Sequence, residues 1–165
     1  MSSTATRTLV LGFALATAFA CDAPRRSGFA ATLVVTDRLD RFMNERSHSS
    51  AVRPVSAARG DIVWGLITFS HCVADAHGRC RVVADFTVLR PDGSTYATHD
   101  GADVWSATPP WGREPQLSSA RLGLHLKPGD PLGRYRIRAV VTDLEAKRSL
   151  TLESAFDVGE RTTAR

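Results

Sequence analysis

The sequence predicts an all-β domain built as a sandwich of two sheets. Two observations lead to this prediction. Short segments in which apolar and polar residues alternate recur along most of the chain, as expected of half-buried strands. Turn-forming clusters separate these segments, such as Pro91-Asp92-Gly93 and the run from Pro128 to Gly133. The length of 165 residues suits a single domain.

The first twenty residues have the features of a secretion signal. Arg7 supplies a positive charge, and an uncharged, largely apolar stretch runs from Leu9 to Phe19. Ala18-Phe19-Ala20 then gives the small-x-small pattern that a signal peptidase cleaves. As a helix this stretch would rise only about 16 Å, well short of a bilayer core of about 30 Å. We therefore assign residues 1–20 to a signal peptide and expect an exported, periplasmic protein.

Cys21 follows the predicted cleavage site directly, and two fates stay open for it. Bacterial lipoproteins are cleaved before a cysteine that then carries lipid, but Ala18 and Phe19 match the usual lipobox poorly. Ordinary cleavage would leave a free N-terminal cysteine, which is a liability in an oxidised secreted chain. A lipid anchor at Cys21 is the one attachment to a membrane that we expect.

A strand and a short helix are predicted to open the mature domain. The strand covers Phe29 to Val35, and the helix covers Thr36 to Arg46. The apolar residues of the helix recur at helical spacing, at Leu39, Phe42 and Met43. The residues from Ser47 to Gly60 are predicted to form a loop with a short strand near Val55.

A hairpin is predicted between Ile62–Cys72 and Cys80–Leu89, two segments that both alternate. With the two cysteines directly opposite each other, Leu66 would face Phe86 on one apolar side. The register implied by a disulfide is thus also the register that the apolar pattern favours.

The C-terminal hairpin has the clearest pattern. Opposing Tyr135 to Phe156 gathers the apolar residues of both strands on one face. The same register places Arg138 opposite Glu153 and Arg134 opposite Asp157 on the other face. A slip by one residue would oppose core residues to polar ones. We therefore interpret the arginines as a solvated face rather than an anion-binding one.

The remaining strands are predicted at Ser94–Thr98, Asp103–Ser106 and Ala120–Leu126, with Leu122, Leu124 and Leu126 pointing inward. About seven short strands joined by turns are typical of an immunoglobulin-like sandwich. We assign residues 21–28 to a tether, 29–159 to the sandwich and 160–165 to a tail.

Cys72 and Cys80 are predicted to form a disulfide, the default pairing in an oxidising compartment. The alternative is a metal site, because His71 and His77 would add two nitrogen ligands. The usual Cys-x-x-Cys or His-x-x-x-His spacing is absent, so the disulfide is favoured.

Charge and motifs argue against two function classes. A pI of about 9.4 suggests nucleic acid, but the arginines are scattered without interleaved aromatic residues, so we expect no nucleic-acid partner. The chain has no Gly-x-Ser-x-Gly elbow, and Asp85 is expected on a wet sheet face. The histidines fall in predicted loops or at outward strand positions: His48, His71, His77, His99 and His125. We predict neither catalytic residues nor a cofactor.

The stretch from Gly101 to Ser118 is predicted to contain a long loop. It carries Trp105 and Trp111, and tryptophans on long loops often contact carbohydrate or peptide. For Trp105 a place in the core is favoured, whereas Trp111 could pack the loop down or bind a ligand.

Several segments resemble a family of small exported bacterial proteins without an established function, which carry an immunoglobulin-like or fibronectin-like domain. The segments are FTVLRPDGSTYA at Phe86–Ala97, Trp105 with Pro109-Pro110, Leu122-Gly123, and PGDPLGRYRIRA at Pro128–Ala139. The resemblance implies fold and export but no activity.

Together these observations predict a non-enzymatic binding or assembly module of the bacterial cell envelope, with a protein or glycan partner. Recognition of carbohydrate or peptidoglycan fragments through the Trp105–Trp111 loop is the first alternative. Metal binding by His71, Cys72, His77 and Cys80 is the second.

Overall fold

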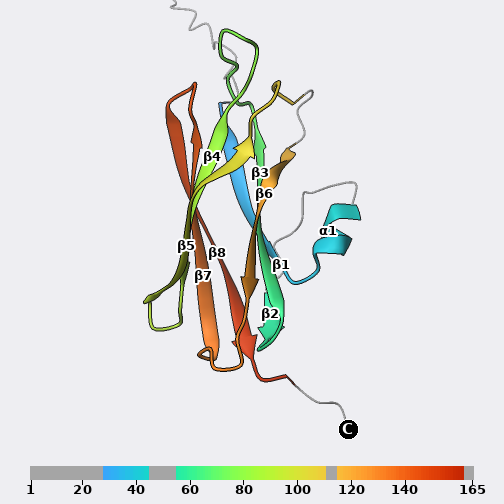
Figure 1. Cartoon of the computed structure of the whole chain (residues 1–165), viewed down its shortest axis with the longest axis vertical. Helices are drawn as coiled ribbons and strands as arrows, with labels where there is room; N and C mark the ends of the chain where they lie inside the picture. Colours follow the sequence, from blue (N-terminus) through green and yellow to red (C-terminus); the bar gives the residue numbers. More distant parts are fainter. Residues whose placement is uncertain (1–27, 45–54, 111–114, 162–165) are drawn as a thin grey trace, which may run out of the picture.

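A computed structural model describes residues 28–44, 55–110 and 115–161, which form two β-sheets packed face to face (Figure 1). The described part of the chain contains one helix, α1 (Leu39–Asn44), and eight strands where about seven were predicted. The strands are β1 (Ala30–Thr36), β2 (Val55–Ala58), β3 (Ile62–Ser70), β4 (Val82–Leu89), β5 (Thr95–Trp105), β6 (Gln116–His125), β7 (Gly133–Asp143) and β8 (Arg148–Gly159). The predicted all-β sandwich is confirmed.

One sheet has three strands in the order β1-β3-β6, and the other has five in the order β2-β8-β7-β4-β5. Along the described strands the chain changes sheet at every step except from β4 to β5 and from β7 to β8. All described pairs are antiparallel except β2 with β8, which run parallel at the edge of the larger sheet.

The core lies between the sheets and is built by alternation along the strands. Tyr135 is fully buried at its centre and stacks on Phe156 with ring centroids 5.4 Å apart. Burying a side chain of this size is worth about 1.5–3 kcal/mol. Further large side chains with almost no exposed surface come from both sheets, among them Phe69, Ile67 and Val63 from β3, and Phe86, Val82, Val88, Val104 and Ile137 from the larger sheet.

The predicted C-terminal hairpin is confirmed residue by residue as β7 and β8. Tyr135 pairs with Phe156, and Arg138 lies opposite Glu153 as expected. The ion pair forms on the diagonal instead, with Arg136 Nη1 3.9 Å from Glu153 Oε1. Both side chains are about half exposed, so this pair contributes little to stability.

The predicted hairpin between residues 62–72 and 80–89 is wrong. Leu66 pairs with Val34 of β1 and Arg121 of β6, whereas Phe86 pairs with Ala139 of β7. β3 and β4 therefore lie in different sheets, and the segment between the cysteines carries the chain across. The alternation of apolar and polar residues does not distinguish a hairpin from two strands in opposite sheets. In both arrangements each strand has one apolar face that points into the core.

Several boundaries also differ from the prediction. β5 continues as one bulged strand from Thr95 to Trp105, where a loop between two short strands was expected. Gly101 permits this path, since its φ of +66° at the bulge is strained for other residues. β6 begins at Gln116 rather than Ala120, and α1 begins at Leu39 rather than Thr36. In the helix Phe42 is buried, but Met43 is 39% exposed.

The signal peptide, residues 21–27 of the tether (Cys21 among them) and the last four residues of the tail lie outside the described residues. No helix in the described ranges is long and apolar enough to cross a membrane.

Candidate functional site

The described site candidates from the sequence lie in or next to two neighbouring loops: His71, Cys72, His77 and Cys80 in one, and Trp105, the last residue of β5, at the start of the other. One loop follows β3 and the other follows β5, and both lie at the upper end of the sandwich in Figure 1. We call residues 71–81 and 105–110 together the loop platform.

A disulfide joins Cys72 to Cys80, with the two Cα atoms 6.0 Å apart, as predicted. Cys80 is completely buried within the core. By chain entropy a loop of this length is worth about 2–3 kcal/mol. Because zinc binds thiolates, the metal alternative loses two of its four ligands. The described residues contain no group of three or more His, Cys, Asp or Glu side chains arranged to hold a metal ion.

Asp75 organises the loop inside the disulfide. Its Oδ1 accepts hydrogen bonds from the backbone N–H groups of His77 and Arg79, at 2.8 and 2.9 Å. The Arg79 bond is the largest influence and, with that of His77, lowers the pKa of the Asp75 carboxyl despite partial desolvation. Gly78 closes the turn with a φ of +74°. The carboxylate is thus part of the loop's internal bonding rather than an open acid.

Hydrogen bonds join the two loops of the platform. The backbone N–H of Cys80 donates to the carbonyl of Ala107 at 2.7 Å. Arg79 Nη2 donates to the carbonyl of Ser106 at 2.6 Å, and the Ser106 hydroxyl donates to Asp103 Oδ2 at 2.7 Å. The platform therefore presents one bonded surface rather than two independent loops.

Asp143, at the end of β7, holds the loop platform to the sandwich by hydrogen bonds to the backbone. Its side chain is fully buried, and Oδ2 accepts the backbone N–H of Val73 at 2.8 Å. Oδ1 accepts the N–H groups of Glu145 and Ala146, both at 3.1 Å. Sequence reasoning missed this residue. An aspartate directly before the turn that joins two strands was the available signal, since aspartate often bonds to the backbone of a turn.

Trp105 packs inward rather than standing free. Its ring lies 5.7 Å from that of Phe69, and Nε1 donates to the carbonyl of Thr108 at 3.0 Å. The indole thus supports its own loop against the core, in line with the core position that was favoured. Trp111 lies outside the described residues, so its role as a ligand contact stays a prediction.

A concavity of about 400 Å³ opens on the loop platform. It is lined by Asp75, His77, Arg79, Arg81 and Ser106. Two arginines therefore border a space in which the one lining carboxylate is already bonded to backbone. Arginine side chains carry positive charge and can donate hydrogen bonds to a ligand.

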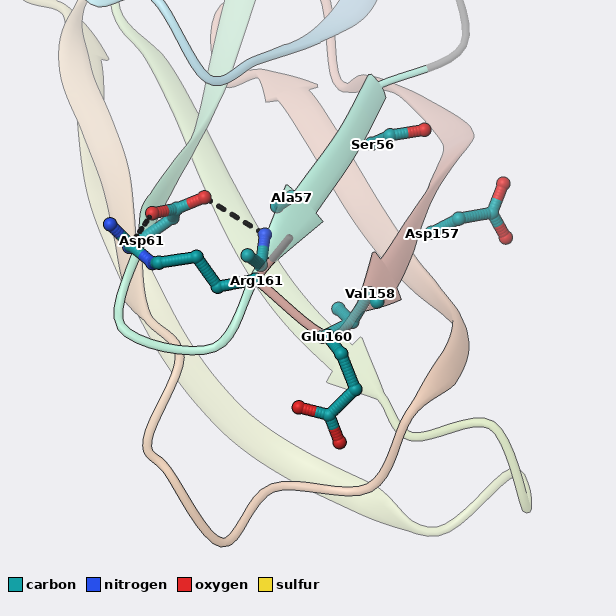
Figure 2. Close-up of a pocket in the computed structure, with 9 residues that line it drawn as sticks. Ser56, Ala57, Asp61, Asp157, Val158, Glu160 and Arg161 are labelled. Carbon is teal, nitrogen blue, oxygen red and sulfur yellow. Dashed lines mark hydrogen bonds and ion pairs between the residues drawn. The ribbon is translucent and has the colours of Figure 1, made fainter. Parts of the chain in front are cut away.

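A second groove, of about 460 Å³, lies at the opposite end of the molecule beside β2 and the end of β8 (Figure 2). Arg161 forms an ion pair with Asp61, whose Oδ2 also accepts the N–H of Ala58 at 2.8 Å. Asp157 and Glu160 line the groove too, and in the view of Figure 2 their carboxylates point away from its centre. Asp61 and Arg161, which both line this groove, are therefore already paired with each other.

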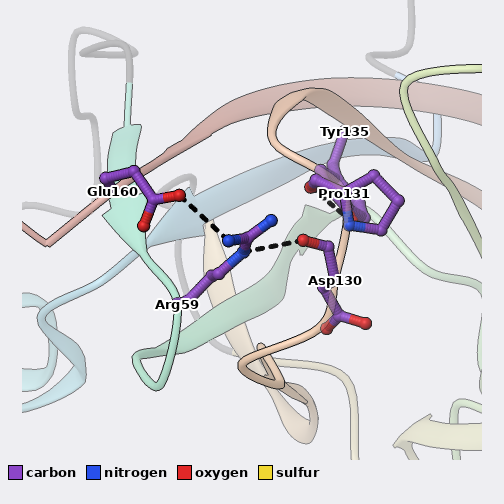
Figure 3. A network of polar contacts seen from close by, with 5 residues as sticks. All are labelled: Arg59, Asp130, Pro131, Tyr135 and Glu160. Atoms are coloured by element: carbon purple, nitrogen blue, oxygen red, sulfur yellow. Dashed lines mark hydrogen bonds and ion pairs between the residues drawn. The ribbon is translucent and has the colours of Figure 1, made fainter.

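The same end of the sandwich is held by a network around Asp130 (Figure 3). Arg59 Nε donates to the Asp130 carbonyl at 2.8 Å, and its Nη1 lies 3.0 Å from Glu160 Oε1. The Tyr135 hydroxyl donates to the carbonyl of Pro131 at 2.9 Å. These contacts join the turn before β7 to the segments that follow β2 and β8.

The Asp130 side chain forms the inner part of this network. Its Oδ2 accepts the hydroxyl of Tyr96 at 2.7 Å and the backbone N–H of Lys127 at 2.6 Å. Burial disfavours the charged form of Asp130, but these two bonds outweigh it and lower the pKa of the carboxyl. Burial, followed by the bond to Asp130, raises the pKa of Tyr96 to about 12. The arrangement fixes a corner of the fold.

Neither a family model nor a curated protein matches this chain. The chain is similar in fold to several solved structures, among them two enzymes and a CARDB domain. A DNA glycosylase of Pseudomonas fluorescens is 14% identical with a TM-score of 0.43, and a family 123 glycoside hydrolase of Clostridium perfringens is 12% identical with a TM-score of 0.47. A CARDB domain from Pyrococcus furiosus is 13% identical with a TM-score of 0.40.

The aligned regions cover 79%, 81% and 81% of this chain, in the same order. They cover 30% of the DNA glycosylase, 27% of the glycoside hydrolase and 96% of the CARDB domain. At TM-scores below 0.5, neither activity nor ligand transfers to this chain from these proteins, and what the chain itself establishes is a disulfide-linked two-sheet β-sandwich.

Proposed function

We propose that this protein is an exported, non-enzymatic binding module of the bacterial cell envelope, and that the loop platform is its binding surface. The observation that carries the proposal is the construction of that platform. The Cys72–Cys80 disulfide closes one loop and the Cys80–Ala107 hydrogen bond joins it to the other, beside a concavity. Binding sites are often loops held by a rigid scaffold, and preorganised loops lose less entropy when they bind.

We also propose that the sandwich is of the immunoglobulin-like type and that the chain belongs with the small exported proteins that it resembles. The order β1-β3-β6 opposite β8-β7-β4 corresponds to strands A-B-E opposite G-F-C of that fold. Tyr135 supports the same proposal. It lies near the start of β7, and its hydroxyl bonds to a carbonyl four residues upstream, like the tyrosine corner of such domains.

Export is supported by the N-terminal sequence and by the disulfide, because disulfides persist in oxidising compartments. Intact-mass measurement on protein recovered from a bacterial host tests this part. We expect a chain that begins at Cys21 and is two mass units lighter than its reduced form. A lipid adduct on Cys21 would establish the anchor, whereas a chain that keeps Met1 would refute export.

Co-sedimentation with purified peptidoglycan sacculi and with envelope glycans tests binding. We expect the mature chain to sediment with one of these fractions. The double variant Cys72→Ser and Cys80→Ser should sediment less while its circular dichroism stays that of a β protein. Retention of full binding by this variant would show that the platform is not the binding surface.

A panel of hydrolase substrates tests the non-enzymatic part of the proposal. We expect no turnover by the mature chain. Turnover that disappears on a single substitution, while the circular dichroism is unchanged, would contradict it.

A further inference from the structure

We propose that the concavity of the loop platform binds an oxyanion, a carboxylate or phosphate group carried by an envelope glycan. This inference rests on the proposed binding function and names the ligand chemistry. The groups that would bind the oxyanion are the guanidinium groups of Arg79 and Arg81, two of the residues that line the concavity.

The position of Cys80 directs both arginines to the same side. Cys80 lies between them in the chain, has no exposed surface, and is tied inward by the disulfide and by its N–H bond to Ala107. Because neighbouring side chains on an extended segment point to opposite sides, Arg79 and Arg81 both point outward. Their Cα atoms are then about 7 Å apart, a span that one oxyanion can bridge through two long side chains.

Each guanidinium keeps donors for a ligand. Arg79 is held in place by its bond to the Ser106 carbonyl, which uses one of five N–H donors. The Arg81 side chain has no hydrogen bond or ion pair with any residue in the described ranges, and its backbone carbonyl is fixed by the N–H of Leu144 at 2.9 Å. The planar guanidinium matches a carboxylate or phosphate in a bidentate geometry.

The charges around the concavity favour an anion. Among the lining residues, the two arginines Arg79 and Arg81 outnumber the one carboxylate, Asp75. The Oδ1 of Asp75 is already occupied by two backbone N–H groups. Asp103 accepts the Ser106 hydroxyl from behind and does not line the space.

The other arginine-rich surfaces are less suited to an anion. On the outer face of the larger sheet, Arg136 is paired with Glu153, and Asp157 lies opposite Arg134. In the groove beside β2 and β8, the lining holds three carboxylates and a single arginine, Arg161. Of these two concavities, the one on the loop platform is therefore the one in which arginines outnumber carboxylates.

Calorimetric titration of the mature, oxidised chain tests the inference with three probes: glucuronate, glycerol 3-phosphate and neutral glucose. We expect heat with the two anions but not with glucose, and weaker binding at higher salt. Arg81→Gln should weaken anion binding about tenfold, the usual size of one charge-assisted bond. Arg79→Gln should do the same.

Arg138→Gln is the matched control, because Arg138 is an exposed arginine on the outer sheet face that likewise has no side-chain bond within the described ranges. It should leave the affinity unchanged. Equal losses in Arg81→Gln and Arg138→Gln, or none in Arg81→Gln, would overturn the site.

The remaining outcomes separate this inference from the proposed function. In one outcome the chain sediments with sacculi, or binds glucose as tightly as the anions, and Arg81→Gln changes neither result. That outcome would overturn the oxyanion site and leave the proposed binding module intact. Failure of every probe and of every envelope fraction would overturn both.

Discussion

Asp143 is a fully buried carboxylate with three backbone N–H partners, contributed by Val73, Glu145 and Ala146. A buried acceptor of this kind contributes mainly because its removal leaves donors unsatisfied. The side chain therefore fixes where the disulfide loop leaves the sandwich, although it does not line the concavity.

Asp143→Ala should lower the free energy of unfolding by about 3 kcal/mol, since three buried or partly buried N–H groups lose their acceptor. Denaturant titration followed by circular dichroism measures the loss. Asp85→Ala is the control, because Asp85 is exposed and accepts one backbone bond, from Gly101. Similar small losses in both variants would show that Asp143 is not an anchor.

Tyr96 and Asp130 should give the protein a pH-dependent stability at both extremes. The pKa of Asp130 is lowered in the folded state, so its stabilising effect is present above the ordinary carboxyl pKa of about 3.9 and is lost as the pH falls through the folded value. The pKa of Tyr96 is raised to about 12, so its contribution is present below about 10 and is lost as the pH rises from about 10 to 12.

Thermal melts across the acidic and alkaline ranges check this prediction. Tyr96→Phe should reduce the loss of stability at both alkaline and acidic pH. It removes the hydroxyl that titrates at alkaline pH, and with it the hydrogen bond that this hydroxyl donates to Asp130. A variant with pH profiles identical to those of the native chain would contradict the assignment.

At the scale of elements, the two outer strands β5 and β6 close one side of the sandwich. The Ser119 hydroxyl lies 3.0 Å from the carbonyl of Asp103 and 3.1 Å from that of Val104. Near the other end, the Tyr96 hydroxyl lies 3.3 Å from the carbonyl of His125. These side chains occupy backbone acceptors that an edge strand would otherwise offer to another chain.

The pairing of β3 with β6 depends on a close approach at Gly123. A Cβ at this position would lie 2.9 Å from Cζ3 of Trp64, so the indole would have to move. Gly123→Ala should therefore cost about 1 kcal/mol or more and shift the Trp64 fluorescence. Gly129→Ala, where a Cβ meets nothing within 4 Å, is the control. Equal stability of the two variants would exclude this packing.

Prediction from sequence succeeded for elements whose partners are adjacent in the chain. The β7–β8 register was predictable because the two strands share a short turn and both faces constrain the pairing. The same reasoning failed for β3 and β4. The cysteines between these strands do form the predicted disulfide, but a disulfide shows only that two segments are close and not that two strands share a sheet.

At the scale of the whole molecule, both sandwich ends are held by side chains distant in sequence. Asp143 joins the turn after β7 to the loop after β3, and Arg59 joins the segment after β2 to the turn before β7. Sequence patterns reveal which residues prefer burial, but not which turns meet at one end of a sandwich. The disulfide and the position of Trp105 were therefore predictable, whereas the shared concavity of residues 75–81 and Ser106 was not.

The proposed function requires the loop platform to be the surface that contacts a ligand. Two-dimensional ¹H–¹⁵N spectra recorded while glucuronate is titrated into the labelled mature chain test this most directly. We expect amide shifts confined to residues 75–81 and 105–108, and their loss in Arg81→Gln. Shifts gathered on β7 around Arg134 and Arg138, or spectra that do not change, would contradict it.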